Sequence, residues 1–314
     1  MIAAVASVVS LGACAPRLAQ LGSEMRTPEI ADGAYVTRDG LRLGLTQWLP
    51  ESGQEPQAVI VALHGMSDYS NAFAIPAPYW AARGIATYAY DQRGFGRSPN
   101  RGLWAGSEAM RRDLADFVDV ARARHPGVPV FVLGESMGGA VAVSAFASGA
   151  PPQADGLVLV SPAVWGWRTL PFLYRLALWT SAHTAPWWHL SSEGLDIWPS
   201  DNIEMLRAFS ADPLVIKGAR ADAIYGLVVL MSEGLDAVSE IDGTKVLMVY
   251  GGNDQIIPGG ATEAALEALS DGAAVKFYPD GYHMILRDLN AEPRWGDIAE
   301  WVLGDEESVA SQAR

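Results

Sequence analysis

The chain has 314 residues, of which half are hydrophobic, and a formal net charge of −14. Such a length can bury one large α/β core or two smaller ones. The acidic balance argues against nucleic acid as a partner, because phosphate binding needs clustered Lys and Arg. The best candidate for a spanning helix, residues 170–188, is interrupted by Pro171, Arg175, His183 and Pro186. It therefore lacks the roughly 20 apolar residues that a membrane span requires.

The first residues resemble the signal peptide of a bacterial lipoprotein. Residues 1–13 are small and apolar and lead through Leu-Gly-Ala to Cys14, the only cysteine, which excludes an intramolecular disulfide. We therefore expect residues 1–13 to be removed and Cys14 to be lipidated, with residues 14–31 as a tether. The protein would then be lipid-anchored in a bacterial cell envelope, on the periplasmic or extracellular side of a membrane. The alternative is a buried N-terminal element with an incidental cysteine, which is favoured by the lack of Lys or Arg before Arg17.

Short β-prone runs then alternate with helical patterns, which favours a mostly parallel sheet flanked by helices. We expect eight strands, at residues 35–38, 41–49, 58–63, 85–90, 130–133, 156–160, 245–250 and 275–278. Asp39-Gly40 predicts a hairpin between the first two strands. Helices are expected at residues 73–83, 107–124, 138–147, 261–269 and 295–303. The polar residues 305–314 are expected to be a disordered tail.

The alternation stops at residues 164–236, where no buried strand is evident. We interpret this segment as a helical lid over the sheet, which leaves residues 32–163 and 237–304 as the core. It holds six tryptophans, namely Trp165, Trp167, Trp179, Trp187, Trp188 and Trp198. Two interpretations of these side chains remain open. They form the core of an ordinary helical subdomain, or they present an aromatic face to an acyl chain, and both can hold for different tryptophans.

The sequence Gly134-Glu135-Ser136-Met137-Gly138 follows an apolar run and precedes a run of small residues. Strand, sharp turn and helix form the context in which G-x-S-x-G acts as a nucleophile elbow. The motif alone is weak, because a glycine-bearing loop between a strand and a helix gives the same letters. The rest of the chain has to supply the partners that a serine nucleophile needs.

A serine hydroxyl requires a base, and the base requires an orienting carboxylate. In α/β-hydrolases the chain order is Ser, acid, His. His283 follows the last expected strand, whereas the other two histidines after Ser136 fall in the lid. Asp254 follows the penultimate strand on a glycine turn and is our candidate acid, although such an aspartate also caps turns. Asp280 and Asp288 compete less well, since one directly precedes the histidine and the other lies beyond it.

An oxyanion hole in this fold uses two backbone N–H groups. One belongs to the residue after the nucleophile, Met137, and the other to a loop after an early strand, for which Met66 is the candidate. His64, in the same loop, is expected to hold the loop through hydrogen bonds and not to act as the base.

Together these motifs resemble the monoacylglycerol lipase and lysophospholipase branch of the α/β-hydrolases, often grouped as serine aminopeptidase S33-like. The matching segments are His64-Gly65-Met66-Ser67-Asp68, Asp91 to Ser98, Gly134 to Gly139, Ala211-Asp212-Pro213-Leu214, Gly252-Asn253-Asp254 and Gly281-Tyr282-His283. The resemblance implies an α/β-hydrolase fold with a helical lid. It implies Ser136 as nucleophile, Asp254 as acid and His283 as base, with oxyanion donors at Met66 and Met137. Many monoacylglycerol lipases carry Glu at the position of Asp68, so chain-length preference is not transferable.

The expected activity is hydrolysis of the carboxylic esters of lipid-like substrates, monoacylglycerols or lysophospholipids, through an acyl-enzyme on Ser136. No cofactor or metal is expected, since the Cys and His residues show no zinc-like spacing. The alternatives are an S33-type aminopeptidase and a general short-chain carboxylesterase. The aminopeptidase would need buried acidic groups in the lid, and the run formed by Glu193, Asp196, Asp201 and Glu204 looks solvated. A non-catalytic binding module would show a broken triad. Dehalogenases and epoxide hydrolases use Asp at the position of Ser136.

Overall fold

The computed structural model describes residues 15–304 except 24, 52, 168, 191–193, 195, 270 and 271. The predicted signal peptide, Cys14, Glu193 and the tail 305–314 lie outside the described residues.

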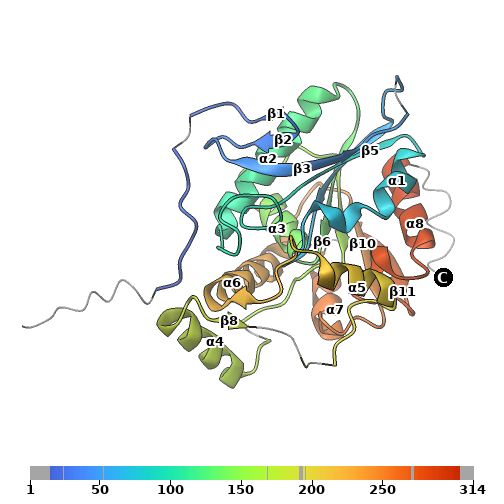
Figure 1. Ribbon diagram of the computed structural model, residues 1–314. Helices are drawn as coiled ribbons and strands as arrows, with labels where there is room; N and C mark the ends of the chain where they lie inside the picture. The colour runs from blue at the N-terminus through green and yellow to red at the C-terminus, as the bar shows by residue number, and fades with distance from the viewer. Residues whose placement is uncertain are drawn as a thin grey trace, which may run out of the picture.

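A nine-stranded sheet forms the centre of the molecule, in the order β1-β2-β3-β5-β4-β6-β7-β10-β11 (Figure 1). From β5 to β11 all neighbours are parallel, whereas β3 pairs with β5, and β1 and β2 with their neighbours, in antiparallel fashion. The strands are β1 Glu29–Ala31, β2 Ala34–Val36, β3 Arg42–Trp48, β4 Ala58–Leu63, β5 Ile85–Tyr90, β6 Val130–Glu135, β7 Gly156–Val160, β10 Val246–Gly251 and β11 Ala274–Tyr278. The mostly parallel sheet predicted from the alternation is confirmed.

The expected number of eight strands is wrong by one, because β1 forms inside the segment predicted as a tether. Asp32 and Gly33 join β1 to β2, and both have positive φ (46° and 71°). Two such residues make the turn whose twist matches a two-residue hairpin. The hairpin predicted at Asp39-Gly40 joins β2 to β3, and Gly40 has a φ of 80°. The Asp-Gly dipeptide therefore marks two hairpins, at Asp32-Gly33 and at Asp39-Gly40, and the prediction included only the second.

Helices cover both faces of the sheet (Figure 1). On one face α2 Ser107–Arg124 and α3 Met137–Phe146 enclose a core that includes Leu114, Phe117 and Val141. On the other face α1 Pro76–Ala81 and α8 Glu292–Leu303 enclose a second core around Trp80 and Ile298. Helix α7, Gly259–Ala268, packs at the edge of the first core. Because both faces are covered, strands β4 to β7 are buried at every residue, which explains their continuous apolar runs. Single turns of 3₁₀ helix lie at η2 Ser70–Phe73, η3 Val238–Glu240 and η4 Ile285–Arg287.

The segment between β7 and β10 is mainly helical. It contains α4 Phe172–Thr184, α5 Ile203–Ala211 and α6 Ala221–Ala237, with β8 His189–Leu190 and β9 Ala219–Arg220 forming a separate two-stranded sheet. Within the described part of the chain, none of its residues joins the central sheet. A helical insertion is therefore present where it was expected, while its action as a lid stays a prediction. No helix among the described residues has the length and apolarity needed to cross a membrane.

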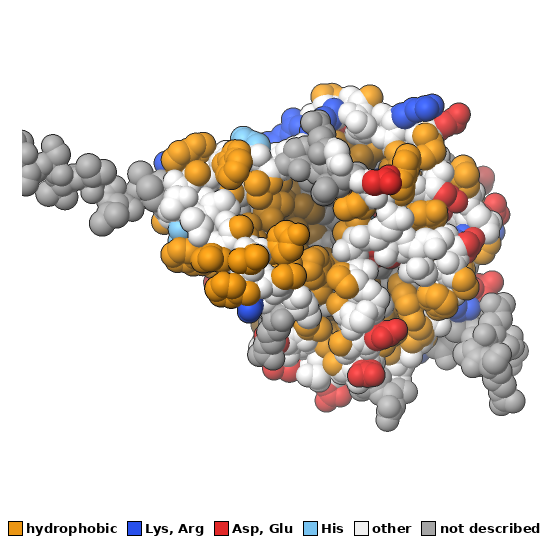
Figure 2. Space-filling model, turned by 90° about the horizontal axis from the view of Figure 1, so that it is seen from below, with side chains coloured by type: hydrophobic (Ala, Val, Ile, Leu, Met, Phe, Trp, Pro, Cys, Tyr) orange, Lys and Arg blue, Asp and Glu red, His pale blue; other side chains and the backbone are white. Residues whose placement is uncertain are grey.

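The tryptophans of the insertion divide into two groups. Trp165 and Trp167 are half-buried, and Trp167 packs edge-on against Tyr225 of α6. The other four, Trp179, Trp187, Trp188 and Trp198, are between 47% and 60% exposed. The interpretation of all six as a core is therefore wrong for these four side chains. Figure 2 shows hydrophobic side chains covering much of this face and surrounding a hollow.

Candidate active site

Ser136 occupies the sharp turn between β6 and α3. Its backbone is in a strained conformation, with φ of 53° and ψ of −116°. The turn is tight enough that a Cβ on Gly138 would lie 2.2 Å from the carbonyl oxygen of Leu63, and a Cβ on Gly134 would lie 2.5 Å from that of Gly138. Only glycine fits at these two positions, which is the physical reason for the G-x-S-x-G spacing. The strand–turn–helix context predicted for the motif is confirmed.

Three loops bring Ser136, His283 and Asp254 together, although they are far apart in the sequence. Asp254 follows β10 and His283 follows β11, so both side chains come from the carboxyl ends of neighbouring parallel strands. His283 Nε2 lies 3.0 Å from Ser136 Oγ, and His283 Nδ1 lies 2.8 Å from Asp254 Oδ2. The carboxylate can only accept, so Nδ1 carries a proton and the neutral ring keeps Nε2 free to accept from the serine hydroxyl. Both partners are buried, with 6% and 9% of their side chains exposed.

The two competing carboxylates are occupied elsewhere. Asp280 pairs with Arg294 at 2.8 Å, and Asp288 accepts hydrogen bonds from Ser200 Oγ and the Tyr282 N–H. Asp254 also accepts the N–H groups of the two residues at 256 and 257 through its other oxygen. It is therefore both a turn aspartate and the neighbour of His283, so the two interpretations of this residue hold at once.

The expected oxyanion donors border the serine. Met137 is the first residue of α3, where N–H groups lack intrahelical partners and the helix dipole is positive. Gly65 passes so close that a Cβ there would lie 3.3 Å from Ser136 Cβ. Among the described residues, neither the Met66 nor the Met137 N–H donates to a protein acceptor. Both amides are thus available to an oxygen bound above Ser136.

His64 is fully buried and holds the loop that carries Met66. Its Nδ1 lies 2.8 Å from the Gly65 carbonyl oxygen, and its Nε2 accepts the Gln92 N–H at 2.9 Å. The Gln92 side chain donates in turn to the His64 carbonyl oxygen. Burial lowers the pKa of His64 and keeps the ring neutral. Its predicted role as a structural hydrogen-bonding residue is confirmed.

A buried charge cluster, which the sequence patterns do not indicate, lies beside the site. Arg287 Nη1 lies 2.8 Å from Asp68 Oδ2, and Arg287 Nη2 lies 3.5 Å from Glu135 Oε2. All three side chains are at most 6% exposed. Asp68 belongs to the loop of Met66, Glu135 precedes Ser136, and Arg287 follows His283 by four residues. One guanidinium therefore ties together the loops that carry the oxyanion donor, the nucleophile and the imidazole. Burial raises the pKa of Glu135, so its ionised form depends on this arginine. The one feature of the sequence that indicated this cluster was an acidic residue, Glu135, inside the buried elbow.

Comparison with known proteins gives a consistent result. The model of the family described as serine aminopeptidase, S33, matches residues 54–290. The chain is 27% identical to a monoacylglycerol lipase of Mycolicibacterium smegmatis over 284 residues, covering 87% of this chain and 97% of that protein. It is 28% identical to the human monoglyceride lipase over 268 residues, covering 81% and 84% of the two chains.

Solved structures share the fold. The crystal structure of a monoacylglycerol lipase from Paleococcus ferrophilus superposes with a TM-score of 0.71 at 22% identity, covering 83% of this chain and 98% of that one. A soluble variant of the Saccharomyces cerevisiae monoglyceride lipase, in complex with a substrate analogue, also gives 0.71, at 18% identity and 90% and 98% coverage. The family model spans most of the chain, and the fold agrees with it. The chain therefore belongs to the serine aminopeptidase S33 family, within the α/β-hydrolases.

Proposed function

We propose that this protein hydrolyses carboxylic esters of lipid-like substrates, monoacylglycerols or lysophospholipids, through an acyl-enzyme on Ser136. The observation that carries the proposal is the continuous hydrogen-bonded chain from Ser136 through His283 to Asp254. The relatives named as monoacylglycerol or monoglyceride lipases support the substrate class.

The arrangement accounts for each step of ester hydrolysis. Ser136 Oγ attacks the ester carbonyl carbon while His283 Nε2 takes the hydroxyl proton. The carbonyl oxygen becomes an oxyanion that accepts from the N–H groups of Met66 and Met137. Collapse of this intermediate breaks the bond to the alcohol oxygen, which leaves with the proton from His283. Water then attacks the acyl-enzyme, His283 takes its proton and returns it to Ser136, and the carboxylic acid departs. Asp254 orients the ring and stabilises its charged form throughout.

The aminopeptidase alternative would require an acidic group to bind a substrate amine. Of the expected candidates, Asp196 and Glu204 are exposed and Asp201 is partly exposed. The buried carboxylate of the insertion, Asp222, is already paired with Arg220 at 2.6 Å. These positions favour an ester over a peptide substrate.

A substrate panel tests the proposal. The purified protein should hydrolyse long-chain 1-monoacylglycerols and p-nitrophenyl esters of medium and long acyl chains, and Ser136→Ala should not. Turnover confined to p-nitrophenyl acetate would indicate a short-chain carboxylesterase instead. Cleavage of proline naphthylamide without release of fatty acid from monoacylglycerol would overturn the proposal in favour of an aminopeptidase.

The location of the protein is a separate part of the proposal. We propose that Cys14 is lipidated after removal of residues 1–13, which would anchor the protein in a bacterial envelope. The apolar run that ends at Cys14 supports this. Cells treated with globomycin should accumulate the unprocessed form, as should cells that carry Cys14→Ala. An unmodified Cys14 in the protein from untreated cells would contradict the proposal.

A further inference from the structure

A groove of about 500 Å³ lies at the two-stranded sheet of β8 and β9. Four of its lining side chains are basic, namely Arg101, His189, Lys217 and Arg220, and none of the described residues that line it is acidic. We call it the basic groove. Asp and Glu outnumber Lys and Arg by 36 to 22 in the whole chain. A groove whose charged side chains are all cationic therefore differs in charge from the rest of the protein.

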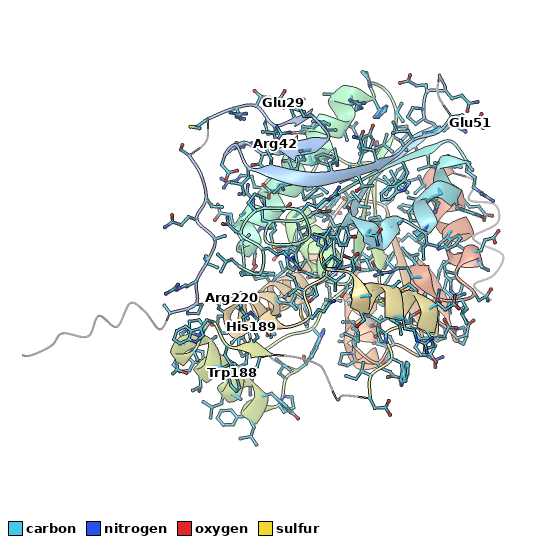
Figure 3. All side chains as sticks on the ribbon, in the orientation of Figure 1. Glu29, Arg42, Glu51, Trp188, His189 and Arg220 are labelled. Carbon is cyan, nitrogen blue, oxygen red and sulfur yellow. The ribbon has the colours of Figure 1, made fainter. Side chains whose placement is uncertain are left out.

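The basic side chains come from three segments that the fold brings together. Arg101 belongs to the loop between β5 and α2, His189 to β8, and the other two to the segment between α5 and α6. In the antiparallel pair of β8 and β9, His189 lies directly opposite Arg220, so both side chains are on one face of the pair. Figure 3 shows these two residues next to each other. Donors from distant parts of the sequence therefore converge on one groove.

The positive charge of the groove is only partly neutralised. Arg101 donates through Nη2 to two backbone carbonyl oxygens of residues 213–215, which leaves its charge without a counterion. Lys217 is exposed, and within the described part of the chain no carboxylate pairs with it. Arg220 is paired with buried Asp222, at 2.9 Å through Nε and 2.6 Å through Nη2, so its Nη1 is left for a ligand. Two unneutralised charges and several N–H donors thus face the groove.

Phosphate is the anion that fits this set of donors best. A phosphate monoester carries close to two negative charges and three strong acceptor oxygens. A guanidinium offers N–H pairs that match phosphate oxygens, and a lysine ammonium adds a point charge on a flexible stem. A carboxylate would supply one charge and two oxygens, and would leave part of the groove unmatched.

One wall of the groove is attached to the loop of an expected oxyanion donor. Ile216 lines the groove, and its N–H donates to the Ser67 carbonyl oxygen at 2.9 Å. Ser67 directly follows Met66 and has a left-handed backbone, with a φ of 70°. A residue in this conformation depends on its surroundings to hold it. An anion bound between the two sides of the groove would fix residues 213–220 and, through Ile216, this loop.

We propose that the basic groove binds a phosphate-bearing anion, and that the bound phosphate holds residues 213–220 against the loop of Met66. The phosphate can belong to the headgroup of a single-chain lipid or to a small soluble phosphomonoester, and the experiment below separates these two sources. The inference goes beyond the proposed ester hydrolysis and does not rest on it.

Calorimetric titration of the full chain tests the site. The probes are glycerol 3-phosphate, 1-O-octylglycerol 3-phosphate and, as the matched lipid without phosphate, 1-O-octylglycerol. An ether bond is not a substrate for ester hydrolysis, so turnover does not enter the result. We expect both phosphates to bind, and 1-O-octylglycerol not to displace glycerol 3-phosphate. Tighter binding of the octyl phosphate would identify a lipid as the source, and equal binding a soluble phosphomonoester. Absence of binding by both phosphates, or displacement by 1-O-octylglycerol, would overturn the proposal.

A pair of charge reversals tests where the phosphate binds. Lys217→Glu should weaken the binding of glycerol 3-phosphate at least about tenfold, because a hydrogen bond to a charged group is lost and a repulsive charge replaces it. Arg42→Glu changes the net charge equally, and Figure 3 places Arg42 far from Arg220. It should change the dissociation constant less than about twofold, because salt screens distant exposed charges. Equal weakening in both variants would mean that the probe responds only to net charge, which would overturn the proposal.

Hydrogen exchange tests the link to the loop of Met66. Saturating glycerol 3-phosphate should slow amide exchange in peptides that cover residues 64–68 and 213–220 of the parent protein. The same addition should have no effect on these peptides in Lys217→Glu. Unchanged exchange in the saturated parent would overturn the proposed link. None of these readouts uses ester turnover, so failure of the proposed function can be told apart from failure of phosphate binding.

Discussion

The loops around Ser136 and the insertion around α4 differ in the burial of their side chains. Around Ser136 the charged groups are buried and paired, and a single methyl group on Gly138 would collide with backbone 2.2 Å away. Around α4 large apolar side chains face solvent, and the helix packs mainly on α6. Substitutions at the site would therefore disturb its geometry, whereas substitutions of the exposed side chains of α4 would leave the core unchanged.

Two buried arginines contribute to the rigidity of the core. Arg93 forms two bonds with Asp39 and two with Asp113, and Arg287 bridges Asp68 and Glu135. Each arginine ties together segments that are distant in sequence. Such pairs specify which loops lie together, and removal of one partner leaves a buried charge. Substitutions in the rigid region around Ser136 and the buried arginines should have large effects, and a substitution on exposed α4 a small one.

The largest effect is expected at the carboxylate beside His283. Asp254→Asn removes the acceptor that fixes the imidazole tautomer, so kcat for ester hydrolysis should fall by about 10⁴-fold while the fold is retained. Steady-state kinetics on a p-nitrophenyl ester measure this. The matched control is Asp280→Asn, a nearby carboxylate paired with Arg294, whose kcat should stay close to that of the parent. An equal loss in both variants would remove the distinction between the two aspartates.

The buried arginine of the site comes next. Arg287→Met leaves Asp68 and Glu135 without their cation, and the free energy of unfolding should drop by about 3–5 kcal/mol. Arg42→Met is the control, because its pair with Asp32 spans 3.7 Å on the surface and should cost at most about 1 kcal/mol. Urea unfolding measures both variants. Similar values for the two would show that the charge cluster does not hold the loops.

The third prediction concerns pH. Hydrogen bonds from Arg93 hold the pKa of Asp39 well below its usual range. A lowered folded-state pKa gives stability that is present above the ordinary aspartate pKa and is lost as the pH falls below it. Asp39→Asn should therefore cost about 1–3 kcal/mol at pH 7, and less near pH 3. Chemical unfolding across that range measures the gap between the two proteins, and a gap that widens in acid would contradict the assignment.

The smallest effect is expected on α4. Leu173→Ala should change the free energy of unfolding by no more than about 0.5 kcal/mol, because the side chain already faces water. Leu63→Ala, at a fully buried position of β4, should cost about 2–5 kcal/mol. A large loss at position 173 in thermal unfolding would mean that α4 belongs to the rigid core.

Much of this architecture could be predicted from the sequence because apolar runs and helical spacing are local patterns. Strands β4 to β7 are buried at every residue, and Ser136, Asp254 and His283 each follow a strand, in the chain order of the fold. The helix expected at residues 107–124 occurs with those bounds. The short strand β1 escaped because three residues carry no alternation, although Asp32-Gly33 gave a hairpin signal.

Pairings between residues far apart in the sequence produce no periodic pattern from which they could be predicted. Asp68, Glu135 and Arg287 are far apart in the sequence, and nothing in their spacing indicates that they pair. The exposure of the insertion's tryptophans could not be predicted from the sequence either, because the same residue types occur in protein cores and on apolar surfaces. Their burial depends on which other segments pack against the insertion, and α4 itself has one buried residue.

Mapping the covalent adduct of a fluorophosphonate tests the central claim most directly. The reagent labels an activated serine, so peptide mass spectrometry of the labelled protein identifies the nucleophile. We predict one adduct, on Ser136, that is absent from Ser136→Ala and strongly slowed in Asp254→Asn. An adduct on another residue, or undiminished labelling of Ser136→Ala, would contradict the assignment of Ser136 and the acyl-enzyme mechanism built on it.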